Sequence, residues 1–167
     1  PGRPCEHNLT YWRNLPYIGL GAGAHSWYAR SRFVEVRSIR EYTTRVTAAA
    51  SGGTSAPETK QPVAPVVVGQ SSADFPALPA AAVVEVERIP PELEMAETAM
   101  MGLRLAQGLR LDDFYTRFGT TFGSVFGEAL REVVALGLVE QTDEAVRLTP
   151  RGMLLGNEVF ERLLPDA

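Results

Sequence analysis

The sequence predicts an α+β protein whose C-terminal part, residues 89–167, is a winged-helix-like and mainly helical domain. In this part, apolar residues recur at spacings of three and four, which is typical of helices with one buried face. Two short alternating runs flank a polar turn at 142–144 and predict a β-hairpin. Residues 1–46 instead contain short strand-like runs and a glycine-rich turn. The predicted order of the C-terminal part is helix, helix, helix, hairpin, helix.

The chain has 167 residues, of which 45% are hydrophobic, 22% charged and 8% aromatic, and these fractions are ordinary for a globular protein. No run approaches the roughly 18 apolar residues that span a bilayer, and no signal peptide is visible, so we expect a cytoplasmic protein rather than an integral membrane protein. The single cysteine, Cys5, excludes an internal disulfide and a cluster held by several thiolates of this chain. Because the chain begins with Pro1, we expect it to be a piece of a longer protein with functional residues upstream.

Composition and charge divide the chain into three segments. Residues 1–46 carry seven arginines against three acids and suit an anionic ligand, whereas residues 89–167 have a net charge of −6. That acidic tail argues against a nucleic-acid partner, because phosphate binding needs clustered positive charge. Between them, Ala, Pro, Ser, Gly and Thr supply 25 of the 42 residues of 47–88, which predicts a flexible linker or insertion.

In the first segment, residues 17–24 resemble a short buried strand that runs into the glycine-rich turn. Residues 32–37 alternate apolar and polar side chains, which predicts a half-exposed strand. Ser38 is expected to cap a helix from 39 to about 46, with Glu41 at the capping-box position.

In the last segment, proline and glycine mark the expected ends of the helices. Pro90 and Pro91 suit a helix start, and glycines end the helices that follow. Thr149 and Pro150 are an N-cap and a first helical residue that open one last helix reaching Leu163. The helices are expected at 91–108, 112–118, 122–137 and 150–163, and the hairpin strands at 138–140 and 146–148.

The run from Cys5 to Arg13 contains the densest group of residues able to bind a ligand. A neutral imidazole such as that of His7 is a good iron ligand. Asn8 and Tyr11 could orient the ring or bind a polar edge, Trp12 offers a flat apolar face to a macrocycle, and Arg13 could pair with haem propionates. The alternative is that His7 and Asn8 satisfy backbone groups at a turn while Trp12 fills a core.

A second candidate site lies in the glycine-rich turn at residues 19–26. Its pattern fits the dinucleotide fingerprint G-x-G-x-x-A, but no helix and no βαβ unit follow it. Gly21 and Gly23 would still allow a ligand to approach the backbone closely, with His25 at the mouth of that site. The alternative is a tight turn with a surface histidine.

Taken together, these motifs resemble the oxygen-independent coproporphyrinogen III oxidase-like radical SAM family, and within it the haem chaperone branch. The resemblance covers about 125 of the 167 residues, all except the linker, which is longer than the family pattern. The motifs that carry it lie in the same order as in the family, at residues 1–14, 17–26, 36–42, 102–105, 114–119, 148–152 and 157–160.

The resemblance implies that residues 1–46 are the last elements of a radical SAM (β/α) barrel. The complete protein would then bind S-adenosylmethionine at a 4Fe–4S cluster, whose three cysteines are absent from this chain. The motif His7-Asn8-x-x-Tyr11 is linked to haem binding in the family, with His7 as the ligand of the haem iron. Gly21, Gly23 and His25 would line the S-adenosylmethionine and substrate cavity.

The resemblance therefore implies a haem chaperone that serves porphyrin and haem metabolism. Its partners would be haem or a porphyrinogen, the upstream barrel of the same polypeptide, and haem-accepting proteins. The alternative is an enzyme that oxidatively decarboxylates the propionates of coproporphyrinogen III to give protoporphyrinogen IX. No catalytic residue is assigned in this chain, which is expected to be inactive alone.

Overall fold

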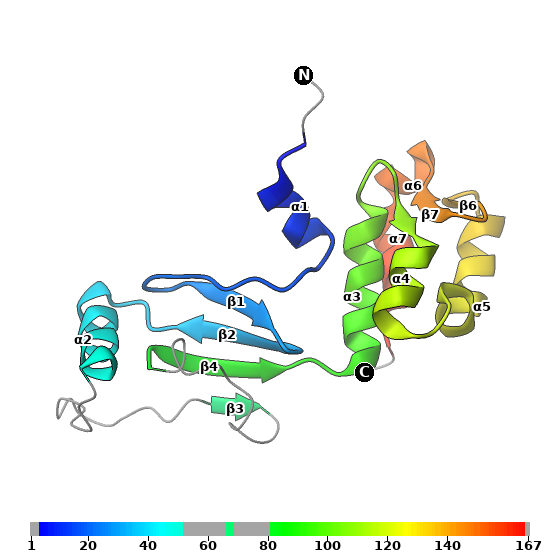
Figure 1. Cartoon of the computed structure of the whole chain (residues 1–167). Helices are drawn as coiled ribbons and strands as arrows, with labels where there is room; N and C mark the ends of the chain where they lie inside the picture. Colours follow the sequence, from blue (N-terminus) through cyan, green and yellow to red (C-terminus); the bar gives the residue numbers. More distant parts are fainter. Residues whose placement is uncertain (1–3, 52–65, 69–80, 166–167) are drawn as a thin grey trace. The chain divides into compact units, whose positions relative to one another are not determined.

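The computed structural model describes residues 4–51, 66–68 and 81–165, which form a mixed α/β fold (Figure 1). The chain divides into two compact units. One contains the chain up to Leu15 together with everything from Pro91 onward, and the other contains Pro16–Pro90. The sequence-based division instead grouped residues 1–46. The difference arises because the first helix packs on a helix about 80 residues later, a contact that no local pattern reveals.

The unit from Pro16 to Pro90, here the sheet unit, is built on a four-stranded sheet with the order β1-β2-β4-β3. Neighbouring strands are antiparallel except β3 and β4, which are parallel. A (β/α) barrel consists of parallel strands, whereas two of the three strand pairs in this sheet are antiparallel. The predicted barrel is therefore not confirmed by this sheet and stays a prediction. The elements are β1 (His25–Tyr28), β2 (Ser31–Glu35), α2 (Ile39–Ala50), β3 (Val66–Val68) and β4 (Val83–Arg88).

Several predictions for the sheet unit are confirmed and one is wrong. Ser38 caps α2 by accepting the N–H of Glu41 at 3.4 Å, and the strand predicted at 32–37 is β2. The strand predicted at 17–24 is absent: only Tyr17 forms an isolated bridge, to Trp27, and Leu20 is 84% exposed. The extended conformation is broken because Gly21 and Gly23 have φ values of 115° and 73°.

The predicted linker at 47–88 is too long at both ends. Helix α2 continues to Ala50, and β4 occupies Val83–Arg88, where Val83 and Val86 pack with Phe33 in a small core. The central parts of the predicted linker, 52–65 and 69–80, lie outside the described residues.

The second unit, here the helical unit, follows the predicted order of helices and hairpin. A two-residue strand, β5, also pairs with β7, which gives a three-stranded sheet of order β5-β7-β6. The elements are α1 (Glu6–Trp12), α3 (Pro91–Leu103), β5 (Leu109–Arg110), α4 (Leu111–Phe118), α5 (Phe122–Ala135), β6 (Val139–Gln141), β7 (Ala145–Leu148), α6 (Pro150–Leu154), α7 (Gly156–Phe160) and η2 (Glu161–Leu163).

The core of the helical unit centres on aromatic rings from α4 and α5. Phe114 is fully buried, with ring centroids 5.4 Å from Phe122 and 6.2 Å from Phe126, in edge-on arrangements. Small residues on α3, Ala96 and Ala99, are fully buried in the same cluster. The apolar spacing of three and four therefore marks the buried faces of these helices.

The predicted last helix is broken, which corrects the expectation of one continuous helix to Leu163. The break lies at Leu155, where φ is −113° and ψ is 31°. A Cβ at Gly156 would lie 3.0 Å from the Phe160 ring, so the chain after the break packs closely against that ring. Glycine is also a weak helix former, and the segment divides into α6, α7 and η2.

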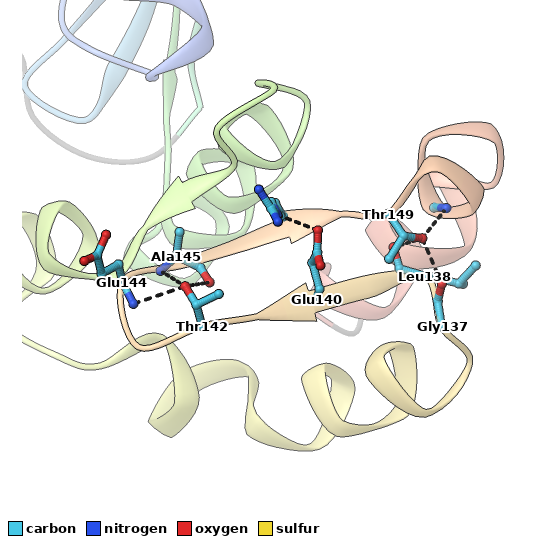
Figure 2. Close-up of polar contacts among 9 residues, drawn as sticks. Gly137, Leu138, Glu140, Thr142, Glu144, Ala145 and Thr149 are labelled. Carbon is cyan, nitrogen blue, oxygen red and sulfur yellow. Dashed lines mark hydrogen bonds and ion pairs between the residues drawn. The ribbon is translucent and has the colours of Figure 1, made fainter.

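Thr149 joins the start of α6 to the turn between α5 and β6 (Figure 2). Its hydroxyl accepts the N–H of Gly152 at 3.0 Å and lies 2.8 Å from the carbonyl oxygen of Gly137. We expect Thr149→Ala to lower the free energy of unfolding by about 1 kcal/mol, because an N-cap bond is lost. Urea denaturation would measure the loss, with Thr149→Ser as a control that keeps the hydroxyl. Equal stability of the alanine and serine variants would contradict the assigned cap.

Candidate functional site

Four of the predicted haem-binding residues lie on one short helix, α1, and Arg13 directly follows it. His7 and Tyr11 are one turn apart, and the His7 Nε2 lies 3.3 Å from the Tyr11 hydroxyl. The two rings are nearly perpendicular, at 86°, with centroids 5.2 Å apart. Both side chains are exposed, Tyr11 by 38%. The Tyr11 hydroxyl thus occupies the Nε2 of an exposed imidazole, which leaves Nδ1 as the ring nitrogen for a ligand.

The other three predicted residues lie elsewhere on α1 or directly after it. Asn8 and Trp12 are likewise one turn apart, and they form a second strip about 100° around the helix from the first, because each residue turns an α-helix by about 100°. Asn8 is exposed and Trp12 half-buried, and the exposed Arg13 directly follows the helix. The alternative that His7 and Asn8 lie in a turn is wrong, because both are helical.

A set of contacts that the sequence analysis missed fixes the C-terminal end of α1. Asn14 has φ of 50° and a side chain that is nearly fully buried, and its Nδ2 donates to the Thr98 Oγ1 on α3 at 3.1 Å. Arg117 on α4 donates to the carbonyl oxygen of Arg13 at 3.2 Å and forms an ion pair with Glu94 at 2.7 Å. An asparagine just beyond a helix is a local sign of such an end, but its partners are distant in sequence.

The glycine-rich turn of the sheet unit is closed by backbone hydrogen bonds. The Gly23 N–H donates to the Val36 carbonyl at 2.9 Å, and the Gly19 N–H donates to the buried Ser26 hydroxyl at 3.0 Å. His25 is exposed and begins β1 immediately after the turn. A strand, and not a helix, follows the glycines, so the geometry is not that of a dinucleotide-binding fingerprint.

Glu35, which the sequence analysis did not single out, lies beside this turn. The residue is only 3% exposed, and its Oε2 has no hydrogen-bond partner within the part of the chain that the structure describes. Burial raises the pKa of the Glu35 carboxyl, and a hydrogen bond from the Gly21 N–H opposes this shift in part. Its place on the inward-facing side of β2 is the signal that could have identified it.

We expect Glu35→Gln to stabilise the sheet unit at pH 7. Because the folded pKa is raised above the unfolded value, the charged carboxylate costs stability above the raised pKa, and this cost disappears as the pH falls through it. Glutamine removes the charge and can still accept the Gly21 N–H. Thermal unfolding between pH 4.5 and 8 should show a gain for the variant that shrinks with falling pH. A gain independent of pH, or a loss at pH 7, would contradict the assignment.

The residues of this chain fit haem but not an iron–sulfur cluster. An exposed imidazole, an indole and a guanidinium are groups able to bind the iron, the ring and the propionates of haem, respectively. The sequence has one cysteine, and the described residues contain no group of three metal-binding side chains. Within the same residues, no helix is long and apolar enough to cross a membrane.

Comparison with known proteins identifies the C-terminal part. The family model of the HemN C-terminal domain matches residues 89–155. This confirms the family resemblance that the motifs indicated. The match begins just before α3 and ends at the break after α6, so the matched region includes the hairpin but not α1.

Similarity to curated proteins extends over nearly the whole chain. The chain is 29% identical over 165 residues to the heme chaperone HemW of Bacillus subtilis, covering 99% of the chain and 36% of that protein. It is 25% identical over 166 residues to the heme chaperone HemW of Lactococcus lactis, covering 99% and 35%. The chain therefore spans about a third of the length of these relatives.

Among solved structures, the chain is similar to the coproporphyrinogen III oxidase HemN of Escherichia coli, described as a radical SAM enzyme. The TM-score is 0.51 and the identity 14%, over 89% of this chain and 28% of that protein. At this identity the likeness concerns the fold alone.

Proposed function

We propose that this chain is part of a haem chaperone that binds haem through α1. The observation that carries the proposal is the exposed His7 imidazole, held 3.3 Å from the Tyr11 hydroxyl, in a chain similar to heme chaperones over 99% of its length. An exposed ligand suits a protein that must take up haem and release it again. The proposed location is the cytoplasm, and the proposed partners are haem-accepting proteins.

Four residues of α1, and Arg13 directly after it, have proposed roles toward haem. When bound, haem would supply an iron that His7 would hold through its imidazole. Tyr11 holds the imidazole through its hydroxyl, and such partners of a ligating histidine fix the ring orientation and tautomer. Trp12 packs against the macrocycle, Asn8 bonds to a polar edge, and Arg13 pairs with a propionate.

The complete protein has further proposed parts. Gly21, Gly23 and His25 would line the S-adenosylmethionine and substrate cavity, beside a radical SAM barrel that carries the 4Fe–4S cluster. Residues 89–167 would act as a winged-helix-like domain. The acidic balance of this region, with seven arginines against thirteen acids, favours a packing role over nucleic-acid binding.

The experiment that tests the function uses the intact protein. We expect haem titration to give a saturable shift of the Soret band at one equivalent. We also expect an anaerobic assay with coproporphyrinogen III, S-adenosylmethionine and a reductant to give no protoporphyrinogen above background. Protoporphyrinogen formation without haem binding would overturn the proposal and favour the oxidative decarboxylase.

A further inference from the structure

We propose that Asn14 and Arg117 are positioning residues for haem, because they fix the end of the helix that carries His7. This inference rests on the proposed function and deepens it. The HemN C-terminal domain would then act on haem binding through α1, although α3 and α4 contribute none of the proposed haem ligands.

Helix α1 cannot hold its own position. It has seven residues, no buried residue and no side-chain cap at Cys5, where the helix begins. Helices this short are marginal in water, since few hydrogen bonds offset the cost of starting the helix. The direction in which His7 points must therefore depend on contacts outside the helix.

Asn14 supplies the first of these contacts. Its left-handed backbone ends α1 in a Schellman motif, in which the Leu15 N–H donates to the Thr10 carbonyl and the Asn14 N–H to the Tyr11 carbonyl, both at 2.9 Å. The buried side chain then donates to the Thr98 hydroxyl, which itself donates to the Glu94 carbonyl at 2.7 Å. The motif sets where the helix ends, and the side chain attaches that end to α3.

Arg117 supplies the second contact. Its guanidinium uses one nitrogen for the Arg13 carbonyl and the other for the Glu94 carboxylate. The side chains of Arg117 and Glu94 are only 22% and 11% exposed, so the pair is shielded from solvent and holds its geometry better than a surface pair. Residues 13 and 14 are therefore both attached to the body of the helical unit.

These attachments act on His7 through the rigid helix. Arg13 directly follows Trp12, and Tyr11, which contacts the imidazole, lies two residues before Arg13. At about 1.5 Å per residue, His7 lies on the order of 10 Å from Asn14 along the helix axis. Releasing the anchored end would let the strip formed by His7 and Tyr11 turn away from the bound haem.

The test compares three variants of the intact protein by haem titration. Asn14→Gly keeps a residue that tolerates positive φ but removes the bond to Thr98, and Arg117→Gln removes the charged bridge. Arg147→Gln is the matched control, because it removes an exposed ion pair with Glu140 in the hairpin. We expect the first two variants to raise the haem dissociation constant about fivefold each, as for the loss of one hydrogen bond, and the control to leave it unchanged.

A second measurement separates positioning from a general effect on folding. The same substitutions are combined with His7→Ala, and we expect them to have a smaller effect on haem affinity once the ligand is gone, because only the contacts of Asn8, Trp12 and Arg13 then remain. Two outcomes would overturn the inference and leave the proposed function standing. One is that the substitutions lower haem affinity equally with and without His7. The other is that Asn14→Gly and Arg117→Gln bind haem with wild-type affinity while His7→Ala binds it more weakly. If His7→Ala itself binds haem as the wild type does, the proposed function fails first. Should Arg117→Gln fail to fold, Asn14→Gly still decides, because it leaves no buried charge unpaired.

Discussion

Replacing Gly152 with alanine is expected to unfold the helical unit. An added Cβ would lie 1.8 Å from the carbonyl oxygen of Leu138 and 2.8 Å from its carbonyl carbon. Both are backbone atoms of a buried residue, and the same oxygen accepts the Thr149 N–H at 3.0 Å. The loop cannot move away without breaking the hydrogen bonds that start α6. We therefore expect a loss of more than about 3 kcal/mol, at the upper end of the cost of overpacking.

Urea unfolding of the chain, followed by far-UV circular dichroism, measures this loss. The matched control is Gly123→Ala in α5, where an added Cβ meets nothing within 4 Å. Alanine is the better helix former, so the control should be neutral or more stable by up to about 1 kcal/mol. A Gly152→Ala protein as stable as the Gly123→Ala control would show that the α6 start does not approach the hairpin so closely.

Replacing His7 with alanine is expected to weaken haem binding by the intact protein at least tenfold. Losing even a hydrogen-bonded partner of a metal ligand typically costs about 10- to 100-fold in affinity, and losing the ligand itself should cost no less. The exposed position of His7 on a helix without buried residues means that the substitution leaves the fold intact. The effect should therefore fall on binding alone.

The measurement is a Soret titration of both proteins, with circular dichroism to compare their folds. Thr10→Ala serves as the control on the same helix, because it removes only a hydroxyl that bonds to the Glu6 carbonyl within α1. That variant should bind haem as the wild type does. A loss in Thr10→Ala as large as that in His7→Ala would mean that the helix as a whole, and not the imidazole, determines the affinity.

The helical unit could be predicted from the sequence where the signals are local. The apolar spacing predicted α3, α4 and α5, the polar turn at 142–144 predicted the hairpin, and Thr149 with Pro150 predicted the start of α6. In each case neighbouring residues supply both the hydrogen bonds and the buried face, so one short window contains the information.

The remaining features depend on contacts between distant residues. The sequence does not show that Asn14 meets Thr98 or that Arg117 joins Glu94 to the end of α1, because these partners are separated by 23 to 104 positions. The break at Leu155 also depends on the space around Gly156 and Phe160. The residues proposed to bind haem could be identified from a short stretch of sequence, whereas the residues that hold α1 in place could not.

The most direct test of the central claim is the identity of the axial ligand in the intact protein. Electronic and electron paramagnetic resonance spectra of the ferric haem complex would be recorded for the wild type, for His7→Ala and for His7→Ala with added imidazole. We predict a histidine-ligated spectrum that is lost in the variant and restored by imidazole. Identical spectra for the wild type and His7→Ala would contradict the claim that His7 binds the iron.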